Sequence, residues 1–181
     1  MDRIYKFYKS YKSYKIYKNY NLVRDSRISR FFVIFALMEK IQWLTRGGVE
    51  LPPVDTSRLE RWIDAVARGH GRVLGPLTYI FTDDPTILDV NRQFLNHDYF
   101  TDIITFDDTR GRRISGDMFI SLDTVASNAA EVSRRPYEEE LHRVIIHGVL
   151  HLCGINDKGP GEREIMEQHE DDALRLLVTI D

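Results

Sequence analysis

Short hydrophobic runs separated by polar segments recur along the chain from Met38 onward. Four of these runs have the length and side chains typical of β-strands, which favour β-branched and aromatic residues. They predict strands at residues 39–44, 77–82, 102–106 and 117–121.

Other segments have the 3.6-residue periodicity of amphipathic helices. The first predicted helix is capped by Ser57 and ends at Gly69 and Gly71, where glycine suits a helix C-terminus. A second helix opens at Asp84, followed by a proline, and runs through about residue 95. One face of the first helix collects its apolar residues, which are Leu59, Trp62, Ile63 and Val66.

The last third of the chain is predicted to be helical at about 122–133, 137–153 and 161–178. Strands early in the chain and helices late indicate an α+β fold, with a small mixed β-sheet and helices packed on it. The chain shows no internal repeat and no second hydrophobic core after Met38, so residues 38–181 are expected to form one domain.

Residues 1–37 differ in composition from everything that follows. Six tyrosines recur every three residues from Tyr5 to Tyr20, and lysine follows each of the first five. A period of three matches neither helix nor strand, so this segment has no face to bury. We predict a disordered extension, or a start codon called upstream of the true one, with Met38 as the natural alternative start. A basic, aromatic tail that stacks on RNA is the functional alternative.

Charge is distributed unevenly along the chain. The net charge is −3, yet residues 1–37 carry +7 and the remainder has sixteen basic and twenty-six acidic residues. The body of the protein therefore cannot rely on a large positive surface to attract nucleic acid. A local patch with a metal ion, or a partner, would have to draw phosphate in.

Two features bear on the cellular compartment. The apolar run at 31–38 has eight residues, too few to span a bilayer, and no small-residue cleavage pattern follows it. Cys153 is the only cysteine, so an internal disulfide is impossible. We expect a cytoplasmic protein that makes no contact with a membrane.

The segment 141–158 carries the pattern of a metal site. His147 and His151 are four positions apart on a predicted helix, so both imidazoles project from the same face. Gly154 is expected to end that helix, which lets Asp157 return toward the histidines as a third ligand. Three protein ligands with an open fourth position describe a catalytic zinc site, and we expect one Zn²⁺ ion there. His147 is also expected to take part in catalysis.

The residue after His147 argues against a familiar peptidase. Metalloproteases with two histidines at this spacing place a glutamate there as general base, and here the residue is Gly148. The absence of that carboxylate favours an anionic phosphodiester as substrate over a peptide. Glycine inside a helix costs roughly 1 kcal/mol relative to alanine, so close approach of a substrate or of a neighbouring element is expected at this position.

Three ordered segments resemble the YbeY family of rRNA maturation endoribonucleases. The segment from His147 to Asp157 resembles that family's His-Gly-x-Leu-His-Leu-x-Gly-Tyr-Asp-His signature. Leu95-Asn96 followed by Thr101-Asp-Ile-Ile-Thr-Phe106 is similar to its Leu-Asn and Thr-Asp-Val-Leu-Ser-Phe block. Residues 116–121 are similar to its Gly-Asp-Ile-x-Ile-Ser strand.

This resemblance covers about residues 39–175 and implies a fold, an activity and partners. The fold would be an α+β fold related to zincins, with a catalytic zinc. The activity would be cleavage of single-stranded RNA, in maturing the 3′ end of small-subunit rRNA and in ribosome quality control. The partners would be the rRNA precursor and the small ribosomal subunit or its assembly factors.

The chain departs from the family pattern at three places. Asp157 stands where the family usually has its third histidine, which lowers the net charge of a zinc site from +2 to +1 and should acidify bound water less. Asn156 replaces an aspartate. The segment 97–100 is short and lacks the arginine that the family places there for phosphate, so Arg92 or Arg143 is a candidate to replace it.

Four further features receive structural interpretations. His142 lies off the metal face and is expected to be a packing or a surface residue, and Cys153 points away from that face and is expected to serve packing. His97 is a candidate substrate contact in a loop. The glutamates at 138–140 are expected to be a solvated first helical turn.

Two alternative functions remain open. One is a non-catalytic ribosome assembly factor in which the metal only stiffens the turn at 147–157. The other is a zinc peptidase of unfamiliar type, which Gly148 disfavours.

Overall fold

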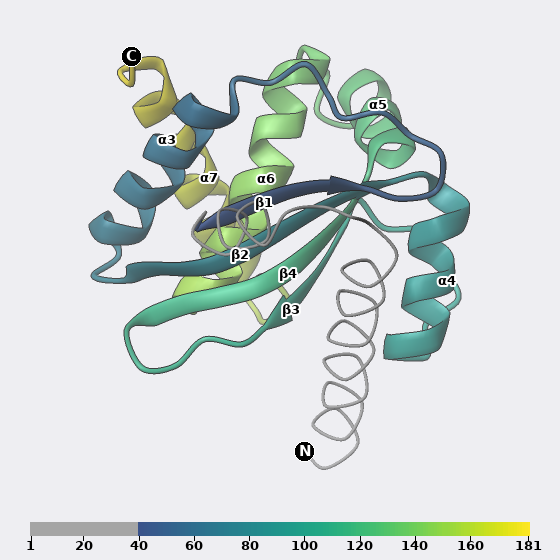
Figure 1. Ribbon diagram of the computed structural model, residues 1–181, viewed down its shortest axis with the longest axis horizontal. Coiled ribbons are helices and arrows are strands. Elements are labelled where there is room, and N and C mark those ends of the chain that lie inside the picture. The colour runs from purple at the N-terminus through teal and green to yellow at the C-terminus, as the bar shows by residue number, and fades with distance from the viewer. Residues whose placement is uncertain (1–39) are drawn as a thin grey trace, which may run out of the picture. The chain divides into compact units, whose positions relative to one another are not determined.

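The computed structural model describes residues 40–181, and Ile41–Asp181 form one compact unit (Figure 1). The predicted extension at 1–37 and the apolar run at 31–38 lie outside the described residues. A four-stranded sheet has the order β1-β2-β4-β3, in which β1, β2 and β4 are parallel and β3 runs antiparallel to β4. The strands are β1 (Ile41–Thr45), β2 (Val73–Thr82), β3 (Ile103–Asp107) and β4 (Arg113–Ser121).

Five helices accompany the sheet in the described part of the chain. They are α3 (Thr56–Gly69), α4 (Asp84–Leu95), α5 (Leu122–Glu131), α6 (Tyr137–Cys153) and α7 (Glu162–Val178). A mixed sheet with packed helices confirms the predicted α+β class. None of the described helices is both long and apolar enough to cross a bilayer.

Two local predictions were wrong. The residue that caps α3 is Asp55, whose carboxylate accepts a hydrogen bond from Arg58 N at 2.9 Å, and not Ser57. Strand β2 begins at Val73, four residues earlier than predicted, because the strand continues through Gly75-Pro76 as an irregularity in its pairing with β4. A Cβ at residue 75 would lie 2.5 Å from Ile114 O, so only glycine permits this approach of the two strands.

One face of the sheet carries the main hydrophobic core. Side chains alternate across a strand, so Tyr79 and Phe81 of β2 lie beside Met118 and Ile120 of β4 in the buried layer. Helices α3, α5, α6 and α7 contribute to the same core and therefore cover this face. Helix α4 packs on the opposite face, where Phe94 contacts Phe106 edge to face at 5.6 Å between ring centroids.

Helix α6 lies unusually close to the sheet at Gly148. A Cβ at this position would come within 2.8 Å of Met118 Sδ and 2.9 Å of Ile103 Cδ1. The glycine is therefore explained by a neighbouring element, the pair β3–β4, and not by the approach of a substrate. Tyr79 strengthens the same contact from its buried position by donating a hydrogen bond to Ile145 O at 3.2 Å. This packing fixes α6 against the edge strand β3.

Candidate metal centre

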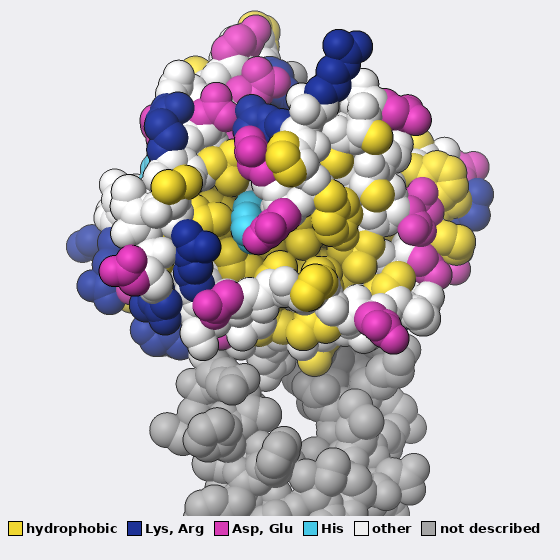
Figure 2. All heavy atoms as spheres, turned by 90° about the horizontal axis from the view of Figure 1, so that it is seen from above, with side chains coloured by type: hydrophobic (Ala, Val, Ile, Leu, Met, Phe, Trp, Pro, Cys, Tyr) yellow, Lys and Arg dark blue, Asp and Glu magenta, His cyan; other side chains and the backbone are white. Residues whose placement is uncertain are grey.

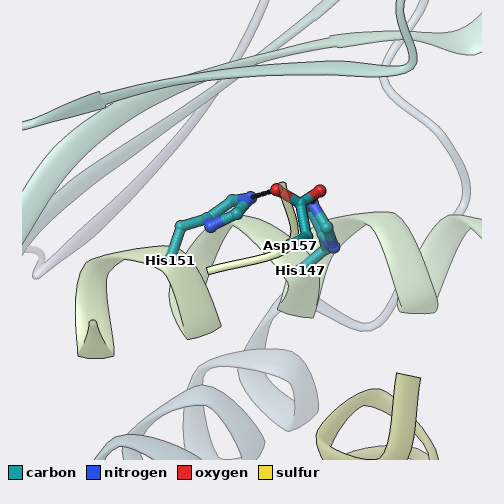
Figure 3. A group of neighbouring side chains, drawn as sticks. All are labelled: His147, His151 and Asp157. Carbon is teal, nitrogen blue, oxygen red and sulfur yellow. Dashed lines mark ion pairs between the residues drawn. The ribbon is translucent and has the colours of Figure 1, made fainter. Parts of the chain in front are cut away.

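The end of α6 turns the chain back toward its own histidines. Gly154 takes a left-handed conformation at φ 98°, and its N–H together with that of Ile155 reaches the carbonyls of the last helical turn. The loop after the turn returns Asp157 to the face of α6 from which His147 and His151 project (Figure 3). The predicted helix end and return loop are therefore present.

Two imidazoles and one carboxylate converge at this point. Asp157 Oδ2 lies 3.7 Å from His147 Nε2, and Asp157 Oδ1 lies 3.9 Å from His151 Nε2. One ligand atom from each of the three residues lies within 4.8 Å of the others, and in the described part of the chain no other His, Cys, Asp or Glu group of this kind occurs.

Hydrogen bonds orient both rings so that Nε2 faces the carboxylate. His151 Nδ1 lies 2.9 Å from Ile155 O, and because a carbonyl only accepts, this nitrogen carries the proton. His147 Nδ1 lies 2.6 Å from Glu170 Oε1, a carboxylate that accepts in the same way. Each ring therefore directs Nε2 toward Asp157 and leaves this nitrogen to bind a metal ion when the ring is neutral. A ligating histidine whose other nitrogen is held by a carbonyl or carboxylate is the usual arrangement around metals.

The donor set suits a divalent cation such as zinc. Tetrahedral zinc has bonds of about 2.0–2.1 Å, which places neighbouring ligand atoms about 3.3 Å apart. The observed separations of 3.7 and 3.9 Å need to shorten by only about half an ångström. Burial, and next the repulsion from His147 in its protonated form, lowers the pKa of His151, which favours the neutral imidazole that a metal requires.

Arg143 and three carboxylates form a partly buried network next to His147. Arg143 Nη2 lies 2.7 Å from Glu140 Oε1 and 3.2 Å from Asp102 Oδ2, and its Nη1 lies 3.1 Å from Glu170 Oε1. Burial opposes the charge of Arg143, but these carboxylates more than offset it and raise its pKa. Glu170 thus links Arg143 to His147.

This network corrects the prediction for Glu140 and bears on the two arginines that were candidates for contacting phosphate. Glu140 is 1% exposed, so it is not part of a solvated turn; it lies one helical turn from Arg143 and is drawn inward by it. Arg143 is enclosed by carboxylates, and Arg92 pairs with Asp98 at 2.6 Å away from the metal group. Arg143 therefore already compensates carboxylate charge, and Arg92 is not among the described residues that line the cleft over the metal group.

A cleft of about 1110 Å³ opens over the metal group. Its walls come from β3, the segment 97–101, the end of α5, the inner face of α6, the segment 156–158 and α7. Eight acidic side chains line it against four basic ones. Figure 2, which draws one face of the molecule, likewise shows acidic side chains scattered among hydrophobic ones, with the largest group of Lys and Arg side chains at one margin. The cleft therefore lacks the positive surface expected of a strong phosphate binder.

Lys158 is the one basic residue lining the cleft that makes no ion pair within the part of the chain that the structure describes. Sequence reasoning missed it, although its position directly after Asp157 was an available signal.

The other candidate residues divide between cleft and core. His97 lines the cleft and stacks on Tyr99. His142 packs edge to face on Trp62 at 6.0 Å between ring centroids, and burial lowers its pKa. Cys153 is buried, and burial raises the pKa of its thiol to about 11, so it is a packing residue as expected.

Comparisons with known proteins identify the family of the chain. The sequence model of a family described as Endoribonuclease YbeY matches residues 52–178. Endoribonuclease YbeY of Parabacteroides distasonis is 60% identical over 129 residues, covering 71% of this chain and 90% of that relative. Endoribonuclease YbeY of Phocaeicola vulgatus is 62% identical over 130 residues, covering 72% and 94%.

A solved structure supports the fold. The solution structure of TM1509 from Thermotoga maritima aligns with a TM-score of 0.50 at 25% identity, covering 76% of this chain and 88% of that one. On the match of the family model and the identity of these relatives, the chain belongs to the Endoribonuclease YbeY family.

Proposed function

We propose that this protein is a zinc-dependent endoribonuclease specific for single-stranded RNA. Membership of the Endoribonuclease YbeY family supports cleavage of RNA. We further propose, from the resemblance of its motifs to that family, that it acts in the cytoplasm. There it would mature the 3′ end of small-subunit rRNA and serve ribosome quality control, with the rRNA precursor and the small subunit as partners.

The observation that carries the proposal is the convergence of His147, His151 and Asp157 at the floor of an open cleft. These three residues would hold the zinc ion and leave a fourth position open. A zinc ion held there would supply a Lewis acid for a phosphate oxygen and would acidify a water molecule.

The chain's own residues prepare this chemistry before substrate arrives. Ile155 O and the Glu170 carboxylate fix the ring orientations of the two histidines by accepting their Nδ1 protons. Asp157 brings a negative charge, so the centre attracts phosphate less strongly than a centre of three histidines would. Correct placement of the RNA in the cleft therefore has to come from additional contacts.

The test combines metal analysis with cleavage of RNA. The purified full chain is expected to contain about one zinc ion and to cleave a single-stranded RNA in preference to the same sequence in a duplex. His147→Ala and His151→Ala are expected to lose both zinc and cleavage. His142→Ala is the matched control, since it removes a histidine from the same helix away from the metal group.

Cleavage that persists at full rate in a zinc-free double variant of His147 and His151 would refute the proposal. Circular dichroism of each variant separates loss of the site from loss of the fold.

One observation favours a second candidate, a non-catalytic ribosome assembly factor. The acidic lining of the cleft and the enclosure of Arg143 leave few cations for a transition state at phosphorus. If a variant without metal ligands restored mature rRNA ends in cells that lack the protein, assembly and not cleavage would be its task.

A further inference from the structure

Two adjacent aromatic side chains stand exposed on the wall of the cleft. Tyr99 and Phe100 are 55% and 56% exposed, and both line the cleft whose floor holds the metal group. Burial of large aromatic rings is strongly favoured, so two exposed neighbours in a concave site need an explanation. The arrangement leaves both rings available to a ligand in the cleft.

The loop that presents these rings is braced. The buried Asn91 side chain donates to Tyr99 O at 2.8 Å, and Asn91 O accepts from His97 N at 3.3 Å. The Tyr99 hydroxyl lies 3.0 Å from His97 Nδ1, and the two rings stack at 5.1 Å between centroids. The Tyr99 ring and the backbone next to Phe100 are therefore held in place before a ligand binds, which reduces the entropy that binding would cost.

Charge alone cannot hold RNA in this cleft. Three of its four cations, Arg135, Arg143 and Arg163, already pair with carboxylates at 3.2 Å or less. The formal charge of the lining side chains is −4, and a divalent ion at the metal group would reduce it only to −2. Of the four cations, Lys158 alone makes no ion pair within the described residues, so it can contact one phosphate. An anionic polymer bound here needs contacts that do not depend on its charge.

We propose that Tyr99 and Phe100 form a base-binding subsite, on which unpaired bases of the RNA stack next to the cleavage site. Every base has an aromatic face, so stacking on a protein ring contributes strongly to binding whatever the RNA sequence. The base has to be unpaired and unstacked from its neighbours, so such a subsite selects single-stranded RNA. The subsite rests on the proposed function for its substrate and adds the residues that select unpaired bases. The exposed area of two rings is far smaller than the roughly 800 Å² that each partner buries in a stable protein complex. The two rings therefore suit the bases of an RNA better than a protein partner.

The test compares two labelled eight-nucleotide RNA strands that differ only in their bases. One carries all its bases, and the other has the same phosphates with the bases at four central positions removed. Binding to the full chain is measured by fluorescence anisotropy with a chelator present, so that no cleavage interferes. The protein is expected to bind the complete strand at least about tenfold more tightly, since each stacked base contributes about one factor of ten.

Substitutions assign the effect to the two rings. Tyr99→Leu with Phe100→Leu is expected to remove the tenfold preference while leaving binding of the base-free strand unchanged, and Phe100→Trp is expected to keep it. Tyr137→Leu is the matched control, because Tyr137 is 40% exposed and lies outside the cleft. Equal thermal stability of the variants excludes misfolding.

Equal binding of both strands, or a preference that survives in the double leucine variant, would overturn the proposal and leave the rings to a protein partner. The outcome is independent of catalysis. Base-dependent binding without zinc-dependent cleavage would contradict the proposed nuclease alone, and cleavage without base-dependent binding would contradict the subsite alone.

Discussion

Glu170 of α7 contacts two residues of α6, His147 and Arg143. Its Oε1 accepts from His147 Nδ1 at 2.6 Å and from Arg143 Nη1 at 3.1 Å, and the side chain is almost fully buried. Arg143 thereby holds the carboxylate in the position that fixes the His147 ring. Glu170 is a positioning residue, because it would act on a bound metal through His147.

Substitution of Glu170 should lower the affinity for zinc in steps. Glu170→Gln keeps an acceptor for the His147 proton but removes the charge, so the affinity should fall by about tenfold. Glu170→Ala removes both, and the fall should approach about a hundredfold, the range known for outer-shell partners. Competition with a chromogenic chelator measures the affinity. Glu167→Gln, on the same helix but paired with the exposed Arg163, should change nothing; an equal loss there would contradict this role.

Lys158 offers the clearest electrostatic test at the residue scale. Each phosphate contact adds about 0.7 to the slope of log affinity against log salt for single strands. Lys158→Ala should therefore reduce that slope by about 0.7 and weaken RNA binding at low salt, and Lys158→Arg should restore both. Anisotropy titrations at four salt concentrations measure the slope. Arg175→Ala, which removes an exposed cation outside the cleft, should leave it unchanged.

At this scale the sequence predicts candidate ligands that are close together in the chain. His147, His151 and Asp157 belong to one helix end and its return loop, so spacing and a glycine suffice to predict that they converge. Glu170 lies 23 residues beyond His147, and Asp102 lies 41 residues before Arg143. Only the packing of α7 and of the loop before β3 against α6 brings these carboxylates in, and no local pattern encodes that packing.

At the scale of elements, the close contact between α6 and the sheet positions the metal face over the edge strand. Gly148 permits this approach, since a Cβ there would meet both Met118 and Ile103. Glycine has a low helical propensity, but at this position it allows α6 to pack closely against the sheet.

Gly148→Ala should show which of the two effects is larger. Alanine gains about 1 kcal/mol in helix propensity, but overpacking of a tight core costs typically 1–3 kcal/mol. We expect a net loss of about 1 kcal/mol in the free energy of unfolding, measured with urea. Gly69→Ala is the matched control, because a Cβ there meets nothing within 4 Å. It should raise stability slightly, and a gain at both positions would contradict the close contact.

Periodicity predicts the helices and strands well, but it predicts the residues at which they begin and end less well. Asp55 and Ser57 are both good capping residues, and only the backbone geometry decides that Asp55 caps α3. The strand was predicted to begin at residue 77, yet Leu74 also pairs with Ile114 of β4, so β2 continues through Gly75 and Pro76 as an irregularity in that pairing. In both cases tertiary contacts override a local signal.

At the scale of the whole molecule, the partly buried His142 couples folding to pH. His142 packs against Trp62, and its burial lowers the pKa below the ordinary value of 6.5. The charges of Glu138 and Glu139 partly oppose this shift, and that of Arg58 adds to it. The folded protein therefore binds this proton less readily than the unfolded chain does.

The sign of the pH dependence follows from this difference. Below pH 6.5 the unfolded chain takes up the proton first, so the free energy of unfolding should fall as the pH drops, until His142 in the folded protein is protonated as well. His142→Leu keeps an apolar side chain against Trp62 and removes the titration. Its free energy of unfolding, measured with urea between pH 7.5 and pH 5, should therefore decline less steeply than that of the parent. Parallel curves for the two proteins would show that His142 is not a source of acid sensitivity, whatever its burial.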